Sequence, residues 1–373
     1  MPTVKEKISI RQFIILTVIF TMGSSVLNGT TMLVRLAHQD AWLASIIGII
    51  YGVLLVLLYG LLTQRHPNLN LADYIDKVLG KWFGTLMKLS FSIYTLLLSS
   101  ALLRTLGDFL TTLILPETPI QAVEIVFMLT LIMGVQLGLE TFTRTSEFLF
   151  PFIMSFIILI ALFLLPQMKL VDNLSPVLEN GIKPILSASY RLLGIPFAEL
   201  ILLLMITPHI TNRKKIRKSM LLGVLGGGIV LVIINVLSIA VLGADATAGL
   251  SYPTYELAKE ISIGNFIQRI EVLAGGIIFI SLFVKSIIVF YVMIVMVTHT
   301  FHVSNYRIIT LPLGMLVMVL SIIIFPNVIY FRNLAFVFWP TFTLLHGLIY
   351  PVLLLGIDSF RRRLNKTKAS LEK

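Results

Sequence analysis

The sequence predicts an all-α membrane protein with ten transmembrane helices, arranged as a 5+5 inverted repeat in which helices 1 and 6 are broken. Composition is the first reason. Of the 373 residues, 57% are hydrophobic and 13% are charged, whereas a soluble domain has about 25% charged residues. The second reason is the number of apolar segments long enough to cross a bilayer. The third is that two of these segments are interrupted at corresponding places in the two halves of the chain.

Ten segments reach the roughly 20 apolar residues that a spanning helix needs. They cover residues 10–33, 41–63, 86–112, 120–138, 147–165, 187–208, 217–243, 270–298, 307–325 and 333–357. We expect a single domain, 1–373, with one repeat at 8–168, a second at 184–358 and a basic tail at 359–373. Because each repeat holds an odd number of helices, the two repeats insert in opposite orientations.

The distribution of basic residues predicts the orientation in the membrane. The net charge is +11, and with a cytoplasmic N-terminus 20 of the 29 basic residues fall in cytoplasmic segments and six in outer ones. The positive-inside rule therefore places both termini in the cytoplasm. Anionic lipid headgroups, and not nucleic acid, are the expected partners of the basic loops and tail.

Several chemistries are disfavoured by the composition. Cysteine is absent, so disulfides and thiolate metal sites are excluded within this chain. His299 and His302 lie three residues apart without an evident third ligand, and we expect no metal and no other cofactor. Polar groups in the spans are few and do not converge as a catalytic set, so we do not expect an enzyme.

The two interrupted segments predict a ligand site. The first carries Gly23-Ser24-Ser25 near its middle, and the second carries Gly194-Ile195-Pro196 with Glu199 one turn further on. Glycine lowers the cost of a non-helical backbone, and proline removes a donor. In hydrocarbon the freed backbone groups must line a cavity or find partners within the protein. Paired breaks of this kind mark binding sites at the membrane midplane.

The expected ligand has a carboxylate. Half-helix N-termini present unpaired N–H groups and a partial positive charge, which suit an anionic group. We expect the amides around Ser24, Ser25 and Val26, with those around Gly194 and Ile195, to form the cradle. The predicted ligand-binding residues also include Gly23, Leu98, Pro196 and Glu199. An alternative for Gly23 is that it only allows two helices to pack closely, as small residues commonly do in membranes.

Five ionisable groups are expected at membrane depth, where they are expensive and mark functional or paired sites. Arg104 and Asp108 are four residues apart, so we interpret them as a structural ion pair. Arg191 is expected to reach the outer interface by snorkelling. Glu199 has two possible roles, as anchor for a ligand ammonium or as partner of Lys285, which has no acidic residue within one turn. We expect Lys285 to contact either that carboxylate or carbonyls near Met22-Gly23.

The order of several short motifs resembles one family. The chain is similar to the B subunit of the spore germinant receptors of endospore-forming bacteria, a branch of the amino acid–polyamine–organocation transporter superfamily. The similar stretches are Lys7-Ile8-Ser9-Ile10-Arg11-Gln12, Asp40-Ala41-Trp42, Leu79-Gly80-Lys81-Trp82, Glu117-Thr118-Pro119-Ile120, the connector at residues 175–184, and Gln268-Arg269-Ile270-Glu271. The resemblance implies the LeuT-like fold of that superfamily. In this fold helix 8 passes against the first half of helix 1, where sodium-coupled relatives hold a cation. The ammonium of Lys285 is expected to replace that ion.

The resemblance also implies a function. Family members sit in the spore inner membrane with an A subunit and a lipoprotein C subunit, and they recognise small nutrients such as amino acids. We therefore expect a nutrient-sensing subunit that binds a small germinant, an amino acid by family analogy, between broken helices 1 and 6. The alternative is a secondary transporter that carries an amino acid with a coupling cation.

Overall fold

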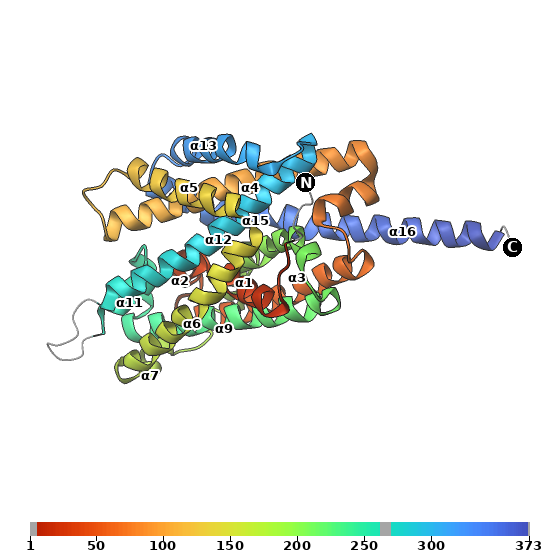
Figure 1. Ribbon diagram of the computed structural model, residues 1–373. Helices are drawn as coiled ribbons and strands as arrows, with labels where there is room; N and C mark the ends of the chain where they lie inside the picture. Colours follow the sequence, from red (N-terminus) through yellow and green to blue (C-terminus); the bar gives the residue numbers. More distant parts are fainter. Residues whose placement is uncertain (1–5, 262–269, 372–373) are drawn as a thin grey trace.

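Apolar helices account for the architecture of the part of the chain that the computed structural model describes, residues 6–261 and 270–371 (Figure 1). Gln268-Arg269 of the predicted motif and the end of the predicted tail lie outside these residues. The first half supplies α1 (Ile10–Met22), α2 (Ser25–Ala37), α3 (Ala41–Arg65), α4 (Leu71–Leu113), α5 (Ile120–Leu137) and α6 (Leu139–Leu164).

The second half begins with a segment that changes its helix type twice. Helix α8 (Ile182–Leu192) passes into a π-helical turn, η3 (Leu193–Phe197), and then into a 3-10 segment, η4 (Ala198–Met205). The long helices α9 (Ile216–Leu242), α12 (Ile270–Phe301) and α13 (Tyr306–Ile324) follow. The last segment consists of α14 (Val328–Asn333), η7 (Leu334–Phe338), α15 (Trp339–Leu344), η8 (Leu345–Ile349) and α16 (Tyr350–Leu371). Short helices α7 (Leu170–Leu174), α10 (Ala244–Gly249) and α11 (Pro253–Lys259) lie in the connections.

Nine stretches of the described residues are long and apolar enough to cross a membrane. The difference from the predicted ten lies at the first break. Helix α1 is too short to count alone, and Ser25–Arg65, which contains both α2 and α3, counts as one stretch of 41 residues. The all-helical membrane fold and the two breaks are confirmed, while ten crossings and an inverted repeat stay predictions.

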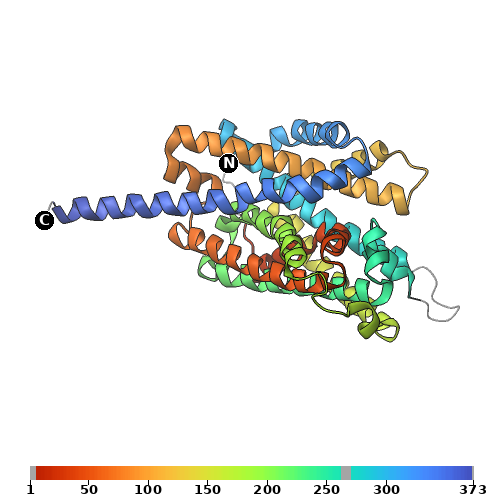
Figure 2. The same cartoon turned by 180° about the vertical axis from the view of Figure 1, so that it is seen from behind.

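Two groups of helices make up the bundle. Helices α4, α5 and α13 pack together on one side and α1, α3 and α9 on the other, and α12 lies against α4 (Figure 1). Helix α16 continues well past one end of the bundle, as the view from behind also shows (Figure 2). We call this the tail end. It also holds the end of α3, because Arg65 pairs with Asp358 of α16 at 2.9 Å.

Close packing of α1 on α9 depends on two glycines. A Cβ atom built on Gly223 would lie 2.4 Å from Cβ of Thr17, and one on Gly227 would lie 2.6 Å from Cβ of Thr21. Small residues at such a spacing let membrane helices approach closely, where van der Waals contact replaces the missing hydrophobic driving force. The first half of broken helix 1 is therefore held against α9.

Two backbone hydrogen bonds link the two broken segments at the tail end. The Ile8 amide donates to the carbonyl of His209 at 2.9 Å, and the Thr211 amide donates back to the carbonyl of Ile8 at 3.0 Å. These bonds join the segment before α1 to the loop that follows η4. The two broken segments are thus tied together at this end.

Replacing Gly227 with alanine should loosen the bundle. The new Cβ would also lie 2.9 Å from the carbonyl oxygen of Val18, which is backbone and cannot turn aside. Overpacking of this kind costs about 1–3 kcal/mol, and we expect a lower midpoint of thermal unfolding in detergent. The matched control is Gly276→Ala, because nothing lies within 4 Å of a Cβ there. A loss of stability in the control as large as that in Gly227→Ala would contradict the packing argument.

Candidate functional site

The first break separates α1 from α2 and is occupied by a side chain from α12. Gly23 has φ 22° and ψ −121°, a conformation that residues with a Cβ rarely adopt. A Cβ at this position would lie 2.3 Å from Cδ of Lys285. Gly23 does allow a close approach, as the alternative interpretation expected. The group that approaches it is the aliphatic part of the Lys285 side chain.

The second break is a π-helical turn followed by the 3-10 segment. Ile195 leaves the helical region with φ −129° and ψ 113°, and Pro196 follows it. A Cβ on Gly194 would lie 2.4 Å from Cα of Pro340, so Gly194 allows α15 to cross here. At both breaks, the absence of a side chain on glycine leaves space for another segment of the protein to approach the backbone.

Lys285 connects the two breaks. Its Nζ lies 2.6 Å from Oε2 of Glu199 and donates to Oγ of Ser24 at 3.0 Å. The side chain of Lys285 is 0% exposed and that of Glu199 is 1% exposed. The Phe20 ring lies against the same ammonium, with its centroid 5.3 Å away, a favourable cation–π arrangement. Of the two contacts expected for Lys285, the structure contains the one with Glu199.

The other oxygen of Glu199 faces an aromatic residue. Trp339 at the start of α15 donates from Nε1 to Oε1 of Glu199 at 3.3 Å. The carboxylate therefore meets a cation on one side and a neutral donor on the other. Both charges of the Lys285–Glu199 pair are buried, and such pairs persist only when their remaining lone pairs and protons also find partners.

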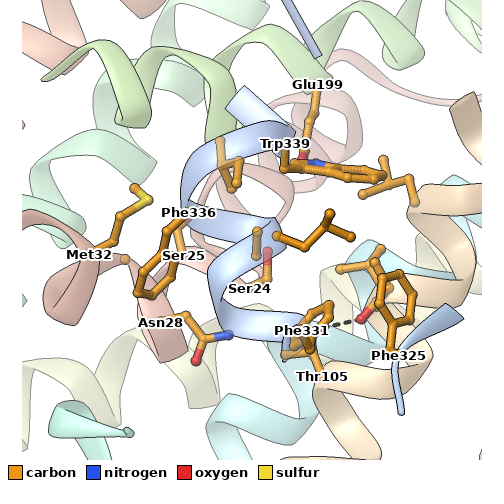
Figure 3. A pocket seen from close by; sticks show the side chains of 17 residues that line it. Ser24, Ser25, Asn28, Met32, Thr105, Glu199, Phe325, Phe331, Phe336 and Trp339 are labelled. Atoms are coloured by element: carbon orange, nitrogen blue, oxygen red, sulfur yellow. Dashed lines mark hydrogen bonds between the residues drawn. The ribbon is translucent and has the colours of Figure 1, made fainter. Parts of the chain in front are cut away.

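A hollow with an empty volume of about 610 Å³, which includes the space open to the outside, is bordered by Glu199 and Trp339, and Lys285 is not part of its lining. In Figure 3, Glu199 and Trp339 lie at one end of the labelled set, and Thr105, Phe325 and Phe331 lie at the other. Its lining comes from α2, α4, η3, η4 and the segment from Phe325 to Trp339.

The hollow receives five of the predicted ligand-binding residues. They are Ser24, Ser25, Leu98, Ile195 and Glu199. The hydroxyl of Ser25 is buried and has no hydrogen-bond partner among the described residues. The other three, Gly23, Gly194 and Pro196, are absent from the lining, as is Lys285, the predicted substitute for a coupling ion.

A π-helical turn forms one wall of the hollow. Leu334, Ala335 and Phe336 of η7 all line it. Arg191 of α8 donates to the carbonyl of Phe336 at 2.6 Å, so its guanidinium finds a backbone acceptor inside the protein and not only the predicted interface. π-Helical turns are rare and occur frequently at functional sites.

The predicted ion pair on α4 lies beside the hollow. Nε of Arg104 and Oδ1 of Asp108 are 2.9 Å apart, and both side chains are buried. Between them, Thr105 lines the main hollow. Asp108 lines a smaller adjacent one, together with Asn28 and Arg332. The geometry agrees with the structural pair inferred from the spacing.

The sequence-based set of five membrane ionisable groups was incomplete. Glu124 in the first turns of α5 is fully buried and accepts a hydrogen bond from Ser321 of α13 at 2.6 Å. It lies near the start of the predicted span at residues 120–138 and was not among the five. The lining residues that sequence reasoning missed are Asn28, Gly29, Met32, Ala101, Leu102, Thr105, Phe325, Phe331, Leu334, Ala335, Phe336 and Trp339. Asn28 follows Ser24 by one helical turn, which was a usable signal.

Known proteins resemble the chain at two levels. A family model described as "Spore germination protein" matches residues 7–329. The chain belongs to the spore germination protein family. Spore germination protein KB of Bacillus subtilis (strain 168) is 30% identical over 326 residues, covering 87% of this chain and 86% of that protein. Spore germination protein YndE of the same organism is 25% identical over 369 residues, covering 96% and 98%.

Two solved structures of LeuT-fold transporters share the fold of this chain. MhsT in complex with L-phenylalanine superposes with a TM-score of 0.69 at 13% identity, covering 95% of this chain and 98% of that chain. The nucleobase-cation-symport transporter Mhp1 gives 0.65 at 12% identity, covering 89% and 75%. At these identities the likeness concerns the fold. The predicted family and LeuT-like fold are confirmed, and the family is of the permease or receptor type.

Removing either partner of the Lys285–Glu199 pair should destabilise the protein. Lys285→Met leaves a buried carboxylate, and Glu199→Gln leaves a buried ammonium, each of which costs about 3–5 kcal/mol. The double variant carries neither charge and should recover most of the loss. Thermal unfolding in detergent measures the cycle. Losses that simply add in the double variant would show that the two charges do not depend on each other.

Proposed function

We propose that this chain is the nutrient-sensing subunit of a spore germinant receptor and that it binds an amino acid in the hollow between the two breaks. The observation that carries the proposal is that the start of α2 and the carboxylate of Glu199 border one hollow. These two features suit the two charged ends of a zwitterion. Family membership supports the role in germination.

The carboxylate of the ligand would bind at the start of α2. The first amides of a helix have no partner within it and carry a partial positive charge. Ser24 and Ser25 stand at this end, and both line the hollow. The unpartnered Ser25 hydroxyl adds a donor beside these amides. Anion binding at a helix N-terminus needs no further basic residue.

The ammonium would bind on the Trp339 side of Glu199. Lys285 already occupies Oε2, whereas among the described residues Oε1 receives a hydrogen bond only from the Trp339 N–H, at 3.3 Å. A carboxylate oxygen can accept more than one hydrogen bond, so Oε1 retains capacity for the ligand. In this arrangement Glu199 serves both roles that the sequence left open.

The rest of the hollow favours an apolar side chain. Phe325, Phe331, Phe336, Met32 and Leu98 supply most of the remaining wall. An apolar group that leaves water for such a wall gains about 25 cal/mol per Å². MhsT, whose structure contains L-phenylalanine, offers a precedent within the fold for an apolar amino acid.

A sensor is favoured over an ion-coupled transporter by the position of Lys285. Its ammonium is tethered between the breaks and bonds to both Ser24 and Glu199. A tethered charge cannot cross the membrane with a substrate, so it stabilises the breaks without supplying a coupling ion. Ligand binding would instead shift a two-state equilibrium and pass this change to the receptor's A and C subunits.

The proposed location is the spore inner membrane with both termini on the core side. Basic residues concentrate at the tail end, where Arg65, Lys77 and Arg213 accompany Arg361 and Arg362. The positive-inside rule makes this the cytoplasmic face. The hollow, formed by the second half of helix 1 and the start of the last span, then lies toward the outer side, from which nutrients arrive.

Filling the hollow should remove ligand binding without unfolding the protein. Gly29 lines the hollow, and a Cβ there would make only one ordinary contact, 3.5 Å from Cβ of Ser25. We expect Gly29→Leu to raise the Kd at least tenfold, about 1.4 kcal/mol, by occupying ligand space. Gly276→Leu is the control, because its surroundings are open. Equal affinity in the two variants would place the ligand elsewhere.

Uptake separates the sensor from the transporter. Purified protein in liposomes should bind a radiolabelled apolar amino acid without accumulating it inside, and the same amino acid should trigger germination in a strain whose only receptor of this kind contains the chain. Accumulation against a gradient would favour the transporter. A screen across amino acids and sugars that found only sugars active would reject the amino-acid site.

A further inference from the structure

A second hollow opens on the side of the bundle, between α4 and the last membrane segment. We call it the lateral groove. It has an empty volume of about 1490 Å³, and most of its walls are apolar. The lining residues are Val78, Leu79, Phe83, Leu86, Met87, Leu89, Ser90, Ile93, Phe342, Tyr350, Leu353, Ile357 and Arg361. Leu86 and Ile93 are 66% and 48% exposed, so the groove opens toward the lipid.

One end of the lateral groove is cationic. Arg361 lines it at the tail end and donates to the carbonyl of Lys77 at 3.5 Å. This contact holds the guanidinium beside the surface part of α4, before the non-helical Gly80. Trp82, directly after that kink, is 89% exposed. Tryptophan at such a site prefers the level of the lipid headgroups, which puts Arg361 within reach of a phosphate.

The other end of the groove connects to the ligand hollow. Ser90 lines the groove, and its hydroxyl lies 3.1 Å from the hydroxyl of Tyr350 and 3.1 Å from Nε2 of His346. The His346 ring stacks on Tyr94 with centroids 4.4 Å apart, and Tyr94 stacks on Trp339 at 6.1 Å. Trp339 holds Glu199 and lines the ligand hollow. A continuous chain of contacts therefore joins the two cavities.

The chemistry of the groove favours a lipid as its occupant. Its walls are mostly apolar, and Arg361 is the one charged residue among the described residues that line it. Apolar walls with one cation, Arg361, at the level of the lipid headgroups match a phospholipid with a negatively charged headgroup. Arginine suits this role because its planar fork binds phosphate in a bidentate manner.

We propose that the lateral groove binds one acyl chain of an anionic phospholipid, that Arg361 binds its phosphate, and that the bound lipid strengthens ligand binding through His346, Tyr94 and Trp339. The lipid site stands on the groove itself. The coupling to the ligand rests on the proposed function. Two separate measurements keep the parts distinct.

Native mass spectrometry tests the lipid site, with phosphatidylglycerol and phosphatidylcholine as probes. Wild-type protein should retain phosphatidylglycerol preferentially, and Arg361→Gln should lower that preference about fivefold, since one basic residue contributes about 1 kcal/mol near an anionic surface. Lys214→Gln, at the tail end but outside the groove, is the matched control. Ile93→Trp should fill the apolar part of the lateral groove and reduce the retention of both lipids. Equal retention of the two lipids by wild type, or an equal effect of the two charge variants, would overturn the site.

Ligand binding in nanodiscs tests the coupling. We expect wild type to bind the amino acid at least threefold more tightly in phosphatidylglycerol than in phosphatidylcholine, and Ile93→Trp to bind it equally in both. A lipid-independent affinity in wild type would overturn the coupling while the lipid site stood. Absence of amino-acid binding in every membrane would instead count against the proposed function. Photocrosslinking from position 93 to a protein helix, and not to lipid, would overturn the proposed occupant.

Discussion

The ion pair between Lys285 and Glu199 is the interaction on which the centre of this molecule depends. Two helices are interrupted inside the membrane, and interrupted backbone is tolerated there only when other parts of the protein satisfy it. Lys285 reaches both interruptions at once, through Ser24 and Glu199, and its stem passes over Gly23. One residue of α12 thereby fixes the relative position of two segments that are far apart in the sequence.

Through Glu199, the pair also borders the hollow that we propose binds the ligand. Glu199 presents one oxygen to Lys285 and the other to Trp339, which itself borders the hollow. Ser24 has the same double position, since its hydroxyl receives Lys285 while its backbone begins α2. Any molecule that contacts Glu199 or Ser24 therefore meets groups whose electrostatics Lys285 already influences. The scaffold and the proposed site cannot be separated at this point.

Much of the fold followed from the sequence because hydrocarbon imposes strong rules. Segment length and glycine or proline content located both breaks, and the four-residue spacing of Arg104 and Asp108 located their pair. The lining was harder to predict. Phe325, Phe331 and Phe336 face the hollow, but aromatic residues on a membrane helix have the same appearance in sequence whether they meet lipid or ligand. Which face points inward is set by the packing of neighbouring helices.

The two glycines at the breaks show a second limit. Both were included among the predicted ligand-binding residues, yet Gly23 accommodates Lys285 and Gly194 accommodates Pro340. A glycine reports that something approaches the backbone closely, but the sequence does not identify the approaching group. Glu124 shows the reverse case, since burial among three helices turned a residue near a helix start into an internal one.

The 3-10 segment η4 makes the second broken helix longer than an α-helix with the same number of residues would be. A 3-10 helix rises about 2.0 Å per residue and an α-helix about 1.5 Å. The eight residues from Ala198 to Met205 would therefore shorten by roughly 4 Å if they rewound as an α-helix. Glu199 lies near the start of this segment. The loop that hydrogen-bonds to Ile8 follows the end of the segment. Rewinding would therefore move this loop and the segment before α1 that is bonded to it. In this way a change at the carboxylate would reach the opposite face of the membrane.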